Sequence, residues 1–238
     1  MNPVVAVVIG MLPEHILLAA IVLLLAIEIA SNRRWNALPL TLLALVFATA
    51  AALALYSGGF GTAPFPGQLM VDPTATLSKA LILALAIPVL LIARDDFVEP
   101  QFHILLLSSL YGACVLLSSE SFLTLFLGLE LMSLPVYAMV LLAYRRPESA
   151  EAALKYLVLG GTATATLLMG ASLLYGSAGS LSLASFRDAL ASTDVMAQMA
   201  IALVIAAFFL KAAVVPFHAW APDAYEAAAV PVTTYMAV

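Results

Sequence analysis

Long apolar stretches separated by short polar ones dominate this chain. A helix needs about twenty apolar residues to cross the hydrocarbon core of a bilayer. On that length we predict seven membrane-spanning helices, at residues 13–31, 37–57, 73–93, 102–119, 121–143, 149–175 and 196–217. An eighth apolar segment begins near Pro231, and we expect the last residues, Tyr235 to Val238, to lie in the middle of that helix.

The composition supports the same fold class. Of the 238 residues, 64% are hydrophobic and 10% are charged, whereas soluble domains carry about 25% charged residues. We therefore predict an all-α polytopic membrane protein with seven to eight transmembrane helices, forming one transmembrane domain over residues 1–238. This composition excludes a soluble enzyme, and the absence of a basic patch excludes a nucleic-acid partner. The single cysteine, Cys114, is expected to be a small buried apolar residue.

The arginines predict the orientation of the chain. They are Arg33, Arg34, Arg94, Arg145, Arg146 and Arg187. All except Arg187 fall in alternate loops, which the positive-inside rule places in the cytoplasm. The N-terminus is then expected outside, without a cleaved signal peptide, because no basic residue precedes the first apolar run. Residues 181–190, LSLASFRDAL, are expected to form a short amphipathic helix on the outer surface.

The lysines are distributed differently from the arginines. Lys79, Lys155 and Lys211 all fall within predicted membrane helices. Arginine stays protonated in every environment, whereas a buried lysine can lose its proton. Lys79 lies about two turns from the outer surface, so we expect its ammonium to reach the interface by snorkelling. His15 and His103 lie near helix starts and are also expected at the interface.

Glu130 and Lys211 are the strongest candidates for function. Glu130 lies near the middle of the fifth predicted span, and ionisable groups at that depth are rare and usually functional. Lys211 lies past the middle of the seventh span. Pro216 follows it and removes one helix hydrogen bond, which predicts a broken helix near Pro216. Irregular backbone at membrane depth is tolerated only inside protein or beside water.

Two more groups are candidate proton carriers. Lys155 follows Glu151 by four residues, so a helical ion pair explains it as well as a transport role does. Thr162 and Thr166 return to the same helix face and predict a polar stripe that leads inward from Lys155. His218 lies just past Pro216, and histidine is the residue type that most often relays protons near neutral pH, although a structural histidine is equally compatible.

These residues suggest a physical mechanism. Burial without a partner favours the neutral form of a glutamate or a lysine, and pairing favours the charged form. We expect Glu130 and Lys211 to face each other across a helix interface. When the pair separates, the lysine would release its proton to the next group. No haem, iron–sulfur or nucleotide motif is present, so we expect no redox group or metal in this chain.

Three sequence blocks resemble one known family. They are GLELMSLPVYAMV around Glu130, EAALKYLVLGGTATATLLMGASLLYGSAGSLS around Lys155, and FFLKAAVVPFHAWAPDAYE, which contains Lys211 and His218. The blocks resemble the antiporter-like membrane subunits of proton-pumping NADH:quinone oxidoreductase, respiratory complex I, and most closely the N subunit. The resemblance assigns the family's glutamate to Glu130, its lysines to Lys155 and Lys211, and its histidine to His218.

The resemblance implies more than the spacing of residues can show. Family members have about fourteen helices with two inverted five-helix repeats, and the first repeat would run here from about residue 102 to the end. NADH, FMN, iron–sulfur clusters and quinone would belong to partner subunits, and this chain would pump protons in a bacterial inner membrane beside other complex I membrane subunits. The outer side, where the arginines predict the N-terminus, would then be the periplasm.

One stretch departs from the family pattern, and two other functions stay open. Ala227, Ala228 and Ala229 stand where the family usually has Gly-Ala-Pro, which puts the turn before the eighth helix in doubt because glycine permits angles that alanine resists. An Mrp-type cation/proton antiporter would share the same motifs. A structural membrane anchor, whose buried charges only hold helices together, is the second alternative.

Overall fold

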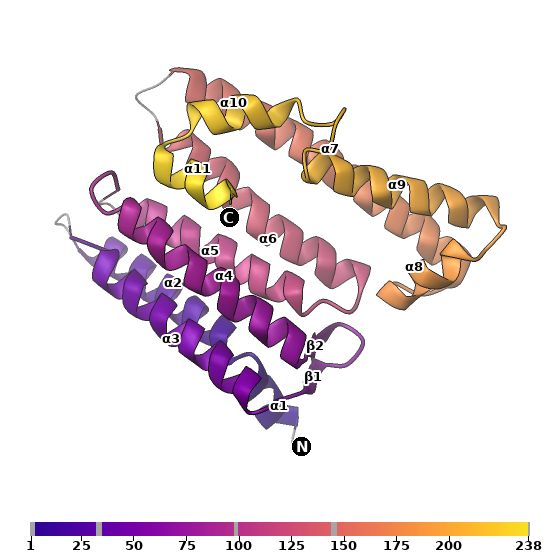
Figure 1. The fold of residues 1–238 in the computed structure, drawn as a ribbon, viewed down its shortest axis with the longest axis horizontal. Helices are drawn as coiled ribbons and strands as arrows, with labels where there is room; N and C mark the ends of the chain where they lie inside the picture. Colours follow the sequence, from indigo (N-terminus) through magenta and orange to yellow (C-terminus); the bar gives the residue numbers. More distant parts are fainter. Residues whose placement is uncertain (1–2, 32–34, 98–99, 144–146, 238) are drawn as a thin grey trace.

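The computed structural model describes residues 3–31, 35–97, 100–143 and 147–237. Within these residues the chain forms eleven helices and one two-stranded hairpin (Figure 1). The elements are α1 (Pro3–Gly10), α2 (Leu12–Ala30), α3 (Leu38–Ser57), β1 (Thr62–Phe65), β2 (Leu69–Val71), α4 (Pro73–Ile92), α5 (Pro100–Leu117), α6 (Phe122–Leu141), α7 (Pro147–Ala178), α8 (Leu183–Leu190), α9 (Val195–Lys211), α10 (Trp220–Ala227) and α11 (Val230–Ala237).

The predicted membrane spans are confirmed for the first six. Helices α2 to α7 are each long and apolar enough to cross a membrane, with mean hydropathies from 1.5 to 2.3. Helices α8 and α9 meet at a bend of 120° and make a seventh span if they are counted together. The predicted short helix at 181–190 is α8, and the predicted eighth apolar segment begins as α11. The chain is therefore a multi-pass membrane protein.

Helix starts follow from local sequence signals. Asp72 caps α4 by accepting a hydrogen bond from the backbone N–H of Ala75 at 2.6 Å. Ser121 and Thr124 form a capping box at the start of α6, and Asp194 accepts from two backbone N–H groups at the start of α9. Each cap satisfies donors that the first helical turn leaves unpaired.

The seventh predicted span, 196–217, is wrong at its C-terminal end. Helix α9 stops at Lys211, and Ala213 has a φ of 52°. That left-handed conformation costs an alanine about 1–2 kcal/mol, so the surrounding packing holds it there. Pro216 has no N–H and would have removed one more helix hydrogen bond. The broken helix expected near Pro216 therefore begins several residues earlier, directly after Lys211.

The turn before α11 forms without the glycine and the proline. Helix α10 ends at Ala227, and Ala228 is extended, with φ −69° and ψ 157°. Any residue adopts these angles readily. The three alanines are therefore compatible with the turn before α11.

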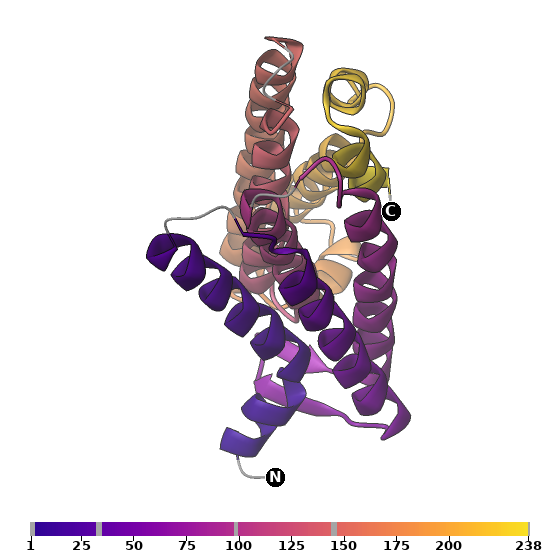
Figure 2. The same ribbon diagram turned by 90° about the vertical axis from the view of Figure 1, so that its left-hand side faces the viewer.

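A small hairpin that the all-helical prediction omitted closes one end of the helix bundle. Strands β1 and β2 are antiparallel and lie beside α1 (Figure 2). The hairpin is tied to the α5–α6 connection, because Glu120 N donates to Gln68 O at 2.9 Å and Ser121 Oγ donates to Gln68 Oε1 at 2.7 Å. The first bond pairs two backbone groups that would otherwise lack a partner at this end of the bundle, and the second joins two side chains.

Four of the six arginines that predict the orientation lie outside the described residues. They are Arg33, Arg34, Arg145 and Arg146. Arg94 and Arg187 are described, and each pairs with the aspartate that follows it. The outside position of the N-terminus therefore stays a prediction.

Small residues set the closest helix contacts. A Cβ added to Gly160 of α7 would clash with the hydroxyl of Tyr137 of α6, whereas a Cβ added to the neighbouring Gly161 would meet nothing within 4 Å among the described residues. Gly160 thus lets the Tyr137 ring lie directly against the α7 backbone.

We expect Gly160→Ala to destabilise the protein and Gly161→Ala not to. The first should lower the free energy of unfolding by about 1–3 kcal/mol, because the tyrosine must move. The second should leave it unchanged or raise it by up to about 1 kcal/mol, because alanine favours the helix. Thermal unfolding in detergent would measure both. Equal effects of the two variants would contradict the close contact.

Candidate functional site

The central feature of the site is an ion pair between α6 and α9. Lys211 Nζ lies 2.9 Å from Glu130 Oε1, and only 12% and 20% of the two side chains are exposed. The prediction that Glu130 and Lys211 face each other across a helix interface is confirmed. The pair brings an acid and a base into direct contact at a mostly buried position between two helices.

Neighbouring hydroxyls complete the surroundings of the pair. Thr164 of α7 donates to the same oxygen, Glu130 Oε1, at 2.5 Å. Ser133, one turn after Glu130, lies 3.5 Å from Lys211 Nζ and donates to Leu129 O. Three helices therefore converge on one carboxylate.

The end of α9 favours a cation at Lys211. The lysine is the last residue of the helix, where unpaired carbonyls form the negative end of the helix dipole. One of these carbonyls, Leu210 O, accepts a hydrogen bond from Trp220 Nε1 at 2.9 Å. The indole therefore holds the break between α9 and α10 next to the ammonium group.

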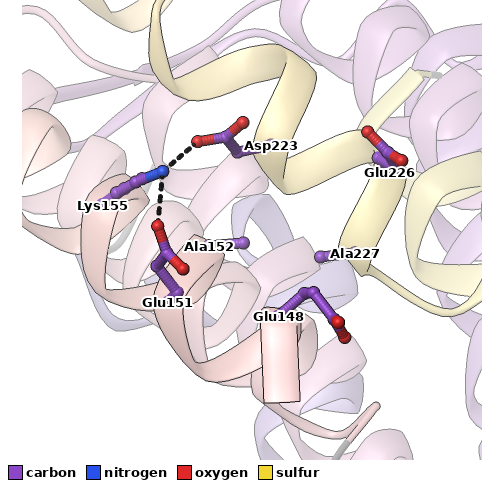
Figure 3. A pocket seen from close by; sticks show the side chains of 7 residues that line it. All are labelled: Glu148, Glu151, Ala152, Lys155, Asp223, Glu226 and Ala227. Atoms are coloured by element: carbon purple, nitrogen blue, oxygen red, sulfur yellow. Dashed lines mark hydrogen bonds and ion pairs between the residues drawn. The ribbon is translucent and has the colours of Figure 1, made fainter. Parts of the chain in front are cut away.

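A polar pocket of about 410 Å³ lies between α7 and α10. Its lining includes Glu148, Glu151, Lys155, Asp223 and Glu226 (Figure 3). Lys155 Nζ lies between two carboxylates, 2.8 Å from Glu151 and 2.6 Å from Asp223. The predicted pair with Glu151 is confirmed, and the second carboxylate adds a contact across the helices.

An aromatic stack joins the pocket to the central pair. Tyr156, next to Lys155, stacks on Trp220 with ring centres 4.1 Å apart and meets the Tyr137 ring at 4.4 Å. Trp220 in turn contacts the end of α9. The three rings therefore link α6, α7 and α10, and Trp220 links them to the end of α9 that carries Lys211.

The polar stripe predicted along α7 does not lead to Glu130. Each helical residue turns by about 100°, so Thr162 and Thr166 share the face of Lys155, while Thr164 lies on the opposite face. Thr162 and Thr166 donate to carbonyls of their own helix. Thr164, which the spacing argument overlooked, makes the contact with the carboxylate.

His218 lies apart from the other candidates. It is exposed in the segment between α9 and α10. Among the contacts of the described residues, its side chain has neither a hydrogen bond nor an ion pair. The structure therefore brings Glu130 and Lys211 together, and places Lys155 and His218 elsewhere.

Lys79 does not snorkel to the interface, as the sequence had suggested. Its side chain is 0% exposed and lies 2.5 Å from Glu14 Oε1, whose side chain is 2% exposed. Glu14 is in the first turn of α2, and Lys79 is two turns into α4. The lysine is buried because a carboxylate at the same depth neutralises it. His103 is likewise buried, with Nε2 3.2 Å from Phe97 O, rather than interfacial.

Two other features concern metal and thiol chemistry. In the described ranges, no group of three histidine, cysteine or acidic side chains is placed to hold a metal ion. Cys114 is buried and free, as the sequence predicted.

Comparison with known sequences identifies relatives of this arrangement. Residues 119–238 match the family described as NADH:quinone oxidoreductase/Mrp antiporter, transmembrane. Subunit N of NADH-quinone oxidoreductase from Pelobacter propionicus is 35% identical over 96% of this chain and 49% of its own length. The same subunit from Granulibacter bethesdensis is 37% identical over 94% and 48%. The chain thus spans about half the length of the curated relatives it matches.

Solved structures share the fold. A chain of respiratory complex I from Thermus thermophilus with bound aureothin superposes with a TM-score of 0.81, at 32% identity over 95% of this chain and 50% of that one. A chain of the Mrp complex from Dietzia sp. DQ12-45-1b, at 23% identity, has a TM-score of 0.79 over 94% and 46%, which establishes a common fold only. Since the family match covers half of the sequence, residues 119–238, this protein belongs to the NADH:quinone oxidoreductase/Mrp antiporter transmembrane family.

Proposed function

We propose that this chain is part of a proton-translocating membrane subunit of NADH:quinone oxidoreductase, of the N type. The observation that carries the proposal is the ion pair between Glu130 and Lys211, 2.9 Å apart and mostly buried. A hydrophobic pair would hold two helices together at lower cost in a membrane, because charges must be desolvated. An acid and a base in contact can instead exchange and release protons.

The proposed step alternates between a closed and an open pair. In the closed state, Glu130 is a carboxylate and Lys211 an ammonium, and the hydroxyls of Thr164 and Ser133 stabilise them. When the helices separate, each charge loses its partner, and the ammonium gives its proton to water or to the next polar group. Reprotonation from the opposite side of the membrane restores the pair.

Lys155 and the acidic pocket are the proposed exchange point with solvent. The carboxylates of Glu151 and Asp223 can collect protons, and Lys155 lies between them. Thr164 follows Lys155 by nine residues, which corresponds to about 13 Å along the helix axis. Protons would need water to cover that distance, and the aromatic stack around Tyr156 would control its entry. His218, exposed beyond α9, is a second proposed relay.

The family membership supports a wider proposal. We propose that redox chemistry with NADH, FMN, iron–sulfur clusters and quinone occurs in partner subunits, and that this chain contacts other complex I membrane subunits in a bacterial inner membrane. Residues from about 102 onward are proposed as the first antiporter-like repeat. The N-terminus is proposed to be periplasmic.

A proton-uptake assay separates this function from the alternatives. Membrane vesicles that contain the assembled complex should take up protons during NADH oxidation, and replacing Lys211 with methionine should lower the number of protons moved per NADH. An Mrp-type antiporter would instead exchange protons with a cation, without NADH or quinone. A structural anchor would lose assembly in the variant, while every complex that did assemble would pump normally.

A further inference from the structure

The turn of α6 that carries Glu130 is held from a second side. Gly112 of α5 lies so close to it that an added Cβ would meet the carbonyl carbon of Leu131 at 2.5 Å and would also clash with Met132 N. Helices α5 and α6 therefore touch backbone to backbone directly after Glu130. Any shift of this turn moves the carboxylate relative to Lys211.

Two hydroxyl groups connect the same turn to α11. Tyr235 OH donates to Ser109 Oγ at 2.8 Å, and Ser109 Oγ donates to Met132 O, also at 2.8 Å. Ser109 is fully buried on α5. Each hydroxyl has one proton to donate, so the geometry fixes the direction of both bonds, and consecutive bonds strengthen each other.

Met132 O can accept this bond because a carbonyl oxygen has two lone pairs, one for its own helix and one for Ser109. The neighbouring carbonyl, Leu131 O, loses its helix donor because Pro135 has no N–H. The connection ends at a carbonyl oxygen, which does not take up a proton under these conditions. It can position the turn, but it cannot conduct protons.

We propose that Tyr235 and Ser109 are positioning residues for Glu130. Through Met132 O they link the location of α11 to the α6 turn, so that a displacement of α11 changes the contact between Glu130 and Lys211. This inference rests on the proposed proton-transfer function of the pair. It adds a route by which a movement of α11 changes the pair, and Glu130 and Lys211 do not provide such a route themselves.

The test uses the assembled complex with Tyr235→Phe or Ser109→Ala. The first readout is the infrared band of the Glu130 carboxyl group, identified by its loss in Glu130→Gln. We expect this band to shift in both variants, and proton uptake per NADH through this subunit to fall by about threefold to tenfold, the effect of one buried hydrogen bond. The double variant should be no worse than the more severe single one.

Tyr225→Phe is the matched control. It removes a tyrosine hydroxyl that also bonds to α11, at Met236 O, 3.0 Å away, but that bond does not reach α6. It should leave the Glu130 band in place. An unchanged band in Tyr235→Phe and Ser109→Ala would overturn the inference whatever the pumping assay gives. Normal pumping by Glu130→Gln would instead refute the proposed function, while a band shift would still support the positioning role.

Discussion

Replacing Glu130 with glutamine is expected to lower proton movement through this subunit by about 100-fold, the usual contribution of a positioned acid or base. Glutamine has nearly the same shape and can still accept a hydrogen bond from Thr164, but it cannot take up a proton. Under the proposed function, pumping by other subunits of the complex would continue, so total uptake per NADH should fall only by the share that this subunit moves. Proton uptake by vesicles, normalised to NADH oxidised, measures that share.

The expected loss reflects chemistry rather than unfolding. Lys211 keeps a hydroxyl neighbour in Ser133, and 12% of its side chain is exposed, so the unpaired ammonium can recruit water. The amount of subunit in the membrane should therefore change little. Thr164→Val is the matched control, since it removes one hydrogen bond to Glu130 and keeps the acid. It should reduce uptake by less than about tenfold. A Thr164→Val variant as severe as Glu130→Gln would contradict the role assigned to the carboxyl group.

The contact between Glu130 and Lys211 was predictable from the sequence because both charges are costly in hydrocarbon. Each lies within an apolar run, and each needs a partner of opposite sign. The helices themselves were equally predictable, since the length and hydropathy of a run determine whether it spans a membrane. Proline predicted the break after Lys211, although not its first residue, because the preceding turn unwound as well.

The hydroxyl partners were not predictable by the same reasoning. Threonine is not costly in a membrane helix, because it can bond to its own backbone, as Thr162 and Thr166 do. Which threonine faces Glu130 depends on the rotation of α7 about its axis. That rotation is set by contacts such as Gly160 against Tyr137, which a single sequence does not reveal.

The pairing of Glu14 with Lys79 could have been found. Both residues lie near the same end of their predicted spans, so two opposite charges were available at one depth. The position of Lys79 taken alone predicts snorkelling, because a long side chain near a helix end usually reaches water. The hairpin and α1 cover this end of the bundle, and neither element was predicted, so the local exposure of Lys79 was overestimated.

Removing the ammonium of Lys79 should therefore be among the most destabilising single changes in this chain. Lys79→Met leaves the Glu14 carboxylate buried without a cation, and one oxygen, Oε2, already has no hydrogen-bond partner among the described residues. Breaking a buried pair from one side typically costs about 3–5 kcal/mol. We expect a loss of that size in the free energy of unfolding, measured by thermal or denaturant unfolding in detergent.

The double variant Glu14→Leu with Lys79→Met distinguishes the buried pair from a general intolerance of the site. Replacing both partners with apolar side chains removes the desolvation cost together with the attraction, so most of the lost stability should return. Glu14→Leu alone should be as damaging as Lys79→Met alone, because it leaves the ammonium unpaired. If Lys79→Met were harmless by itself, the ammonium would have to reach water, and the side chain would snorkel after all. If the double variant were worse than either single one, the two positions would be sensitive to shape rather than to charge.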